Sequence, residues 1–252
     1  MKYLVGDIGN TLTKVCLANK KNKILKSYNI ETKKLNEQKY LSKFFNVILN
    51  KSINKKILFS SVVPKVYSKI GTFLKKKKYQ IYEIKDLKLN KIIKLKVDKY
   101  KQLGSDRIAN AIGSYSTHNT NCLIVDFGTA TTFDIIRKPG VYEGGAIAPG
   151  LQLSIYNLNK STALLPIFKL ITNKKTYGKN TKDALNAGFL WGYQGLINNI
   201  ITKITKTFKC KFKVILTGGY SELFSKFITN KTTIDTNITI KGIMYIYRNL
   251  IK

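Results

Sequence analysis

A stretch near the middle of the chain, residues 123–134, reads Leu-Ile-Val-Asp-Phe-Gly-Thr-Ala-Thr-Thr-Phe-Asp. An apolar run ends at Asp126, turns at Gly128 and continues as a hydroxyl-rich second run. Glycine lets the backbone approach an anion closely, and successive amides in such a turn form an anion-binding nest. The carboxylate at the tip can hold, directly or through water, the cation that accompanies a nucleotide's phosphates. The alternative is a hairpin with an ordinary polar turn, because Asp and Gly are common turn residues.

Residues 3–15 repeat this plan, which makes the ordinary turn a weaker explanation. An apolar run reaches Asp7, a turn follows at Gly9 and Asn10, and a second apolar run begins. The plan therefore occurs once in each half of the chain. Two hairpins with acidic tips could close on one nucleotide from opposite sides.

Length and composition favour a globular protein with one large or two medium domains. The chain has 252 residues, of which 44% are hydrophobic, and this is enough for a sizeable core. No apolar run reaches the roughly 20 residues that a membrane helix needs, and we see no secretory signal. The cysteines Cys16, Cys122 and Cys210 are scattered and fit neither a zinc site nor a disulfide framework. A reducing cytoplasm is the expected location.

The formal net charge of +32 by itself suggests nucleic acid or an anionic membrane as a partner. However, Lys, Asn, Ile and Tyr are all enriched together, which is typical of a drift towards A- and T-rich codons. The lysines are also spread along the chain, with one tight run at residues 75–78. We therefore expect neither a nucleic acid nor a membrane as the partner.

The periodicity of apolar residues predicts a mixed α/β chain. The expected strands cover residues 2–8, 12–18, 23–30, 57–64, 79–84, 122–127, 131–137, 141–148 and 214–216. The expected helices cover residues 37–50, 66–74, 150–159 and 181–207, with another after 105 and a closing helix after 242. Thr181 is a plausible cap for the long helix. His118, the single histidine, is expected in a polar loop.

Gly104-Ser105-Asp106-Arg107 precedes a segment of small and apolar residues that suits a closely packed helix. An acidic group at a helix start is favoured by the unpaired amides there. Asp106 is therefore either a helix cap or a functional carboxylate, and Arg107 either its surface neighbour or a ligand for an anion. The chain contains no GxxxxGK[ST] loop and no GxGxxG fingerprint.

Five motifs together resemble the type III pantothenate kinases, which are also called the Bvg accessory factor family. They lie in the family's order along almost the whole chain, and the full set is far more specific than any one motif. The motifs are Asp7-Ile8-Gly9-Asn10-Thr11, Gly104-Ser105-Asp106-Arg107, Asp126-Phe127-Gly128-Thr129-Ala130-Thr131-Thr132, Gly144-Gly145-Ala146-Ile147-Ala148-Pro149-Gly150 and Thr217-Gly218-Gly219.

The resemblance implies an α/β fold of two actin-like, ribonuclease H-like domains. This is the fold of the acetate and sugar kinase/Hsp70/actin superfamily, with mixed sheets and an interdomain cleft. We expect the domains at residues 1–118 and 119–252. The implied reaction is ATP-dependent phosphorylation of pantothenate at its 4′-hydroxyl, giving 4′-phosphopantothenate in the first step of coenzyme A biosynthesis. The resemblance also implies a homodimer, Mg²⁺ with ATP, and a monovalent cation, K⁺ or NH₄⁺.

The resemblance further assigns roles by position. The ATP-binding residues would be Asp7, Ile8, Gly9, Asn10, Thr11, Leu12, Thr13, Lys14 and Thr129. The metal ligands would be Asp126 for the monovalent cation and Asp7 for Mg²⁺, the latter through water. The pantothenate-binding residues would be Gly104, Ser105, Asp106, Arg107 and Thr181, with Asp106 also the catalytic proton acceptor.

The chain departs from the family pattern just before Gly104. Family members often have a tyrosine seven residues before this glycine and a proline four before it, whereas this chain has Val97 and Tyr100. Either Tyr100 fills the same place or the substrate contact is missing. Two other functions stay open on the residues alone. One is a different small-molecule kinase or a phosphatase acting on polyphosphate, and the other is a non-catalytic regulator or nucleic-acid binder.

Overall fold

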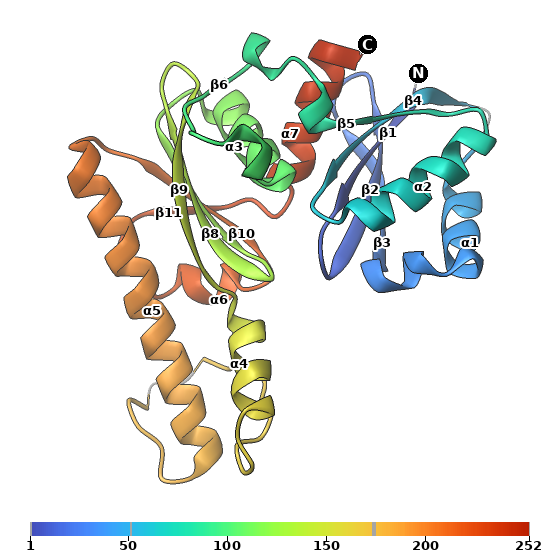
Figure 1. The fold of residues 1–252 in the computed structure, drawn as a ribbon. Helices are drawn as coiled ribbons and strands as arrows, with labels where there is room; N and C mark the ends of the chain where they lie inside the picture. The colour runs from blue at the N-terminus through green and yellow to red at the C-terminus, as the bar shows by residue number, and fades with distance from the viewer. Residues whose placement is uncertain (1, 51, 173–174, 252) are drawn as a thin grey trace. The chain divides into compact units, whose positions relative to one another are not determined.

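The computed structural model describes residues 2–50, 52–172 and 175–251 (Figure 1). The chain divides into two compact units that are not contiguous in sequence. Unit 1 comprises Met1–Asn119, Ile136–Gly144 and Asn237–Lys252, and unit 2 comprises Thr120–Ile135 and Gly145–Thr236. The domain boundary predicted after residue 118 lies next to the first crossing between the units and stays a prediction. Within the described ranges, no helix is long and apolar enough to cross a bilayer.

Unit 1 is built on a five-stranded sheet of order β3-β2-β1-β4-β5. β1 pairs antiparallel with β2, β2 antiparallel with β3, and β1, β4 and β5 run parallel. The ends of β1, β4 and β5 therefore lie at the same edge of the sheet. The strands are β1 (Lys2–Ile8), β2 (Leu12–Asn19), β3 (Ile24–Glu31), β4 (Ile53–Ser61) and β5 (Gln80–Glu83).

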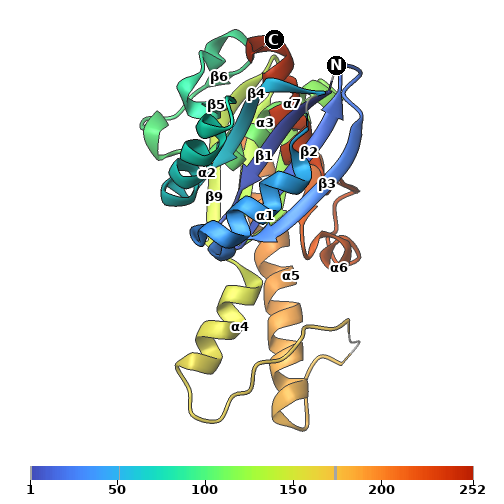
Figure 2. The same ribbon diagram turned by 90° about the vertical axis from the view of Figure 1, so that its right-hand side faces the viewer.

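Helices cover both faces of this sheet (Figure 2). Helices α1 (Gln38–Ile48) and α2 (Pro64–Lys76) pack on one face, where the core cluster includes Leu4 and Ile8 of β1. Because side chains alternate along a strand, Asp7 points to the opposite face. Helices α3 (Ser105–His118) and α7 (Ile238–Ile246) lie there.

Helices α3 and α7 cross at two glycines. A Cβ on Gly242 would lie 2.7 Å from the carbonyl carbon of Ala109, and one on Gly113 would lie 2.9 Å from the amide nitrogen of Gly242. The sequence pattern predicted that the closing helix starts after residue 242. That prediction was wrong, because Gly242 serves as a close-contact site inside a helix that begins at Ile238.

Unit 2 contains the centre of a six-stranded sheet of order β11-β10-β7-β8-β9-β6. β8 and β9 lie on one side of β7, and β10 and β11 lie on the other. In the same way, β2 and β3 lie on one side of β1, and β4 and β5 lie on the other. The short β6 pairs with the part of β9 that belongs to unit 1. The strands are β6 (Lys94–Leu95), β7 (Cys122–Phe127), β8 (Ala130–Arg137), β9 (Val141–Pro149), β10 (Lys213–Gly218) and β11 (Thr232–Ile234).

The helices of unit 2 are α4 (Leu151–Lys160), the long α5 (Thr181–Phe208) and α6 (Ser221–Ser225). Phe133 of β8, Leu190 and Ile197 of α5 and Phe224 of α6 share one buried core. This core fixes α5 on the sheet by one side only, so other side chains of the helix stay exposed.

Short 3₁₀ turns occur after β3 and within the segment that the sequence left unplaced at 85–103, and a π turn follows α7. They are η1 (Thr32–Asn36), η2 (Ile84–Asp86), η3 (Leu89–Lys91), η4 (Tyr100–Gln102) and the π turn η5 (Tyr247–Ile251).

Two local predictions were wrong. His118 is the last residue of α3 rather than part of a loop, because the helix continues until Asn119 adopts the left-handed conformation that ends it. The cap of α5 is Asn180, whose side chain accepts from the backbone N–H of Asp183 at 2.9 Å, and Thr181 is the first helical residue.

Candidate active site

The first acidic hairpin joins β1 to β2 in unit 1. Asp7 stands opposite Lys14 in the register, and the Gly9 N–H donates to the Leu12 carbonyl at 3.1 Å to close the turn. Thr32 holds this turn from outside, since its hydroxyl donates to the Gly9 carbonyl at 2.7 Å and its N–H to the Thr11 carbonyl at 2.9 Å. The hairpin is thus a fixed turn whose tip residues are exposed. The remaining predicted ATP-binding residues, Ile8, Asn10 and Thr13, lie within it.

Lys14 is oriented by a residue distant in sequence. Its ammonium donates to the side-chain oxygen of Asn237 at 2.7 Å, at the start of α7. On the other side of Asp7, the register places the fully buried Ser60 of β4 beside it. Within the part of the chain that the structure describes, the Ser60 hydroxyl has no hydrogen-bond partner. Asp7 therefore lies between a positioned cation and a buried hydroxyl.

The second element is the start of α3, which carries Gly104, Ser105, Asp106 and Arg107. Asp106 folds back over the helix start, where one of its carboxylate oxygens accepts from the Arg107 N–H at 2.8 Å. A Cβ on Gly104 would collide with that same oxygen, so a larger residue there would push the Asp106 carboxylate out of this position. Burial raises the pKa of Asp106, and the Arg107 amide and guanidinium oppose the rise. The N-cap residue of α3 is Gly104, so Asp106 is a first-turn residue that binds the Arg107 amide rather than the predicted cap. Its environment also makes the carboxylate more basic.

Glu83, at the end of β5, was not singled out from the sequence. It is only 9% exposed, and its carboxylate accepts from the Ser105 hydroxyl at 2.5 Å. It also accepts from the N–H of Ser61 at 3.4 Å, one residue after the partner of Asp7 in β4. The Asp7 hairpin and the start of α3 therefore meet at one edge of the unit 1 sheet. Nothing in the local sequence signals this link, because its partners are 22 positions away.

The second acidic turn lies in unit 2, at the end of β7. Asp126 stands beside Thr217 of β10 in the parallel register, and the Gly219 N–H donates to the Phe127 carbonyl at 3.1 Å. Gly218 has φ of +85° and passes so close to Phe127 that a Cβ would lie 2.6 Å from its carbonyl carbon. The Asp126 motif and the Thr217-Gly218-Gly219 motif therefore form one site at the end of the sheet.

Gly150 completes this turn. A Cβ on Gly150 would lie 2.8 Å from the carbonyl oxygen of Gly128 and 2.5 Å from the carbonyl carbon of Thr129. Thr129 itself is exposed at the tip. Three motifs that are far apart in the sequence thus converge within unit 2, around a turn with bare backbone and one carboxylate.

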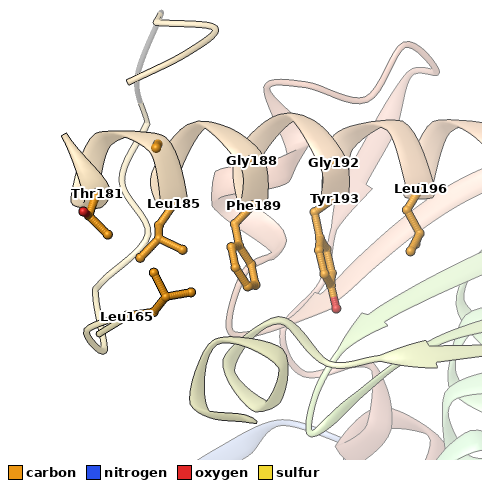
Figure 3. A pocket seen from close by; sticks show the side chains of 9 residues that line it. Leu165, Thr181, Leu185, Gly188, Phe189, Gly192, Tyr193 and Leu196 are labelled. Atoms are coloured by element: carbon orange, nitrogen blue, oxygen red, sulfur yellow. The ribbon is translucent and has the colours of Figure 1, made fainter. Parts of the chain in front are cut away.

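Thr181, the remaining predicted substrate residue, also lies in unit 2. It stands at the end of an apolar groove of about 520 Å³ that follows one side of α5 (Figure 3). Leu185, Phe189 and Tyr193 point to the same side of the helix. Gly104–Arg107 belong to unit 1 and Thr181 to unit 2.

Tyr100, whose role the sequence left open, lines a separate hollow of about 540 Å³ in unit 1. Its hydroxyl donates to the Lys85 carbonyl at 3.2 Å, two residues from Glu83. Burial raises the pKa of Tyr100, and Glu83 and Asp86 add to the rise. Tyr100 therefore lies near enough to Glu83 for the carboxylate to affect its pKa, and Glu83 in turn binds Ser105 at the start of α3.

Comparison with known proteins shows the family of this chain. The model of the family described as type III pantothenate kinase matches residues 3–203. The type III pantothenate kinase of Pelagibacter ubique is 49% identical over 96% of this chain and 96% of its own length.

Two solved structures share the fold. A Baf family protein from Campylobacter jejuni has a TM-score of 0.63 at 19% identity, covering 97% of both chains. The inorganic polyphosphate/ATP-glucomannokinase of an Arthrobacter strain has a TM-score of 0.51 at 10% identity, covering 97% of both chains. Together with further solved structures, among them two proteins described as putative kinases and a dehydratase component, they confirm the predicted actin-like α/β fold. Because the family model and the Pelagibacter ubique enzyme both match most of its sequence, this chain belongs to the type III pantothenate kinase family.

Proposed function

We propose that this protein transfers the γ-phosphoryl group of ATP to the 4′-hydroxyl of pantothenate, which is the first step of coenzyme A biosynthesis. Besides membership of the family, one observation carries the proposal. Asp106, a buried carboxylate of raised pKa, lies beside Arg107 at the sheet edge that also bears the Asp7 hairpin. An acid near the acceptor and a phosphate-binding turn are the two parts that such a transfer needs.

In the proposed step, the 4′-oxygen of pantothenate forms a bond to the γ-phosphorus as the bond from that phosphorus to the β,γ-bridging oxygen breaks. The hydroxyl proton passes to Asp106, and ADP leaves. The transition state is loose, so the hydroxyl becomes acidic only as its bond to phosphorus forms. Asp106 therefore acts mainly by orienting the hydroxyl and accepting its proton late. Arg107, with its forked donors, suits the pantothenate carboxylate.

The Asp7 hairpin of unit 1 would bind phosphates of ATP. Thr129, at the turn of unit 2, is a further proposed ATP-binding residue. Lys14 adds a positive charge that Asn237 already holds in place at 2.7 Å. A fixed lysine loses less conformational freedom when phosphate binds, which favours binding.

The donor groups fit Mg²⁺ carried by ATP. Among the residues that the structure describes, no three His, Cys, Asp or Glu side chains gather into a metal cluster. Mg²⁺ keeps most of its waters and usually takes one or two carboxylates plus substrate phosphates, which matches Asp7 beside the unpartnered buried hydroxyl of Ser60. When bound, the ion neutralises charge on the phosphates.

Asp126 and the nearby carbonyls of Gly128 and Thr129 are oxygen donors suited to a monovalent cation such as K⁺ or NH₄⁺. The carbonyls lie against Gly150, which keeps the turn in place. We propose that this turn holds the cation and that Asp126 is its carboxylate ligand.

We further propose that the protein works as a homodimer through the groove face of α5. The groove face of α5 carries half-buried apolar side chains, and α4 and the segment before α5 expose many large ones, which is unusual for a surface without a partner. Leu164 is 89% exposed. The other exposed apolar residues of α4 and the 160–180 segment are Leu153, Tyr156, Ile167, Ile171 and Tyr177. We also propose a cytoplasmic location, because Cys16, Cys122 and Cys210 are not joined in disulfides.

A coupled assay of ADP release tests the function. The purified chain with ATP, Mg²⁺ and K⁺ is expected to release ADP when pantothenate is added, and much less when Na⁺ replaces K⁺. Mannose, acetate and polyphosphate serve as acceptor controls and should give no release above background. Release with one of these controls but none with pantothenate would refute the proposal and identify another kinase of the same fold.

A further inference from the structure

Glu83 is a buried carboxylate with an uncommon set of partners. It accepts from the Ser105 hydroxyl at 2.5 Å and the Lys85 N–H at 2.6 Å, and more weakly from the Ser61 N–H at 3.4 Å. No ion pair to Glu83 is found among the described residues. Burial raises its pKa, and the hydrogen bonds from Ser105, Lys85 and Ser61 oppose this rise.

This arrangement is costly for stability alone. A buried charge without a cation loses its hydration, and an apolar side chain at this sheet edge would avoid that loss. The retained carboxylate thus calls for a role that an apolar residue cannot fill. Its partners suggest which one, because they lie at the end of β4, just after β5 and at the first residue of α3.

Ser105 is the key partner because it sits between Gly104 and Asp106 in the proposed substrate turn. Its hydroxyl points to Glu83 and is fully buried, so it is not free to contact a substrate. Through this bond the first turn of α3 is fixed to the strand end beside the Asp7 hairpin. The orientation of the Asp106 and Arg107 side chains depends on that turn.

We infer that Glu83 is a positioning residue. It holds Ser105 and so aims Asp106 and Arg107 at pantothenate without touching either substrate itself. The inference rests on the proposed function, and it concerns pantothenate rather than ATP, since the short bond from Ser105 fixes the turn that carries the proposed pantothenate residues, whereas the contact with the Ser61 N–H is long.

Three variants and one control test this: Ser105→Ala, Glu83→Gln, the double variant and Glu143→Gln. Ser105→Ala removes one oxygen and leaves the helix start intact. Glu83→Gln keeps an oxygen for Ser105 but turns an N–H₂ group towards the Lys85 N–H. Glu143 is a matched control, since its side chain is 10% exposed in the same unit and pairs with Lys96 and Arg137 instead.

The readout is the steady-state kcat and KM for each substrate, together with the melting temperature. We expect each single variant to lower kcat/KM for pantothenate by about tenfold to a hundredfold, the effect of misaligning a reacting group by about 1 Å. The KM for ATP should stay unchanged. The double variant should be no worse than the poorer single one, because Ser105→Ala removes the bond to residue 83 and Glu83→Gln, pushed away by the Lys85 N–H, weakens that same bond. Glu143→Gln should leave both kcat/KM values unchanged whatever it does to the melting temperature.

Variants that lose melting temperature but keep wild-type pantothenate kinetics would overturn the inference and leave Glu83 a structural residue. A comparable rise in the KM for ATP and in the KM for pantothenate would overturn it too, because a general disturbance of the site would explain both. If the wild-type chain releases no ADP with pantothenate, the proposed function fails, and this inference fails with it. If the wild-type chain is active but the variants behave like it, only the inference fails.

Discussion

The crossing of α3 and α7 predicts a large effect from the smallest possible substitution, Gly242→Ala. The new Cβ would lie 2.7 Å from the carbonyl carbon of Ala109, whereas ordinary contact begins at 3.4 Å. The difference means that the helices must separate by at least 0.7 Å. The opposing atoms belong to backbone and cannot rotate away, so a cost at the upper end of overpacking, about 3 kcal/mol, is expected.

Alanine is a better helix former than glycine by about 1 kcal/mol, which offsets part of this cost. The net loss of unfolding free energy is then about 2 kcal/mol. For a chain of this size each kcal/mol shifts the melting temperature by about 2–4 °C, so the expected drop is about 4–8 °C. Because α3 begins at Ser105, its displacement should also lower pantothenate turnover.

Differential scanning calorimetry measures the drop, and Gly195→Ala is the matched control. A Cβ on Gly195 of α5 meets no atom within 4 Å, so the same change there should raise stability slightly. A Gly242→Ala variant that melts at or above the wild-type temperature would refute the reasoning, because the helices could then not be in backbone contact.

Three further predictions concern the site and the groove. Asp106→Asn should fold normally and lower kcat by about 10² or more, measured by ADP release. Since burial raises the pKa of Asp106 and the carboxylate is the active form, wild-type activity should fall as the pH drops through that raised pKa. This acid limb should vanish in the variant, and a persisting limb would assign it to another group. Asp126→Ala should reduce both the rate and the difference between K⁺ and Na⁺, whereas an unchanged K⁺ response would exclude it as the cation ligand. Gly188→Arg, where a Cβ meets no atom within 4 Å of the same chain, should leave the monomer folded but prevent a second copy from docking. Light scattering would show a monomer, and a persisting dimer would place the interface elsewhere.

The sequence predicted the elements that depend on local pattern. The strands expected at 2–8 and 122–127 match β1 and β7 residue for residue, because a continuous apolar run with a turn at its end has few alternatives. The motifs at Asp126, Gly150 and Thr217 were found from sequence, but their convergence in unit 2 came only from the register.

What the sequence could not predict depends on long-range partners. Glu83 and Asn237 look like ordinary polar residues until Ser105 and Lys14 are seen beside them. Gly242 was misread for the same reason, since a glycine that allows two helices to touch looks in sequence like one that ends a helix. Tertiary packing decided these positions, and local propensity carried no information about them.

The return of α7 to unit 1 has a consequence for biosynthesis. When the ribosome has made β1 to β5 and α3, the helix that will cover α3 does not yet exist. Residues 120–236 must be translated first, which takes about 6–23 s at a rate of about 5–20 residues per second. During that interval the glycine face of α3 is bare, so a nascent chain stalled or truncated before Ile238 should be a substrate for chaperones and proteases.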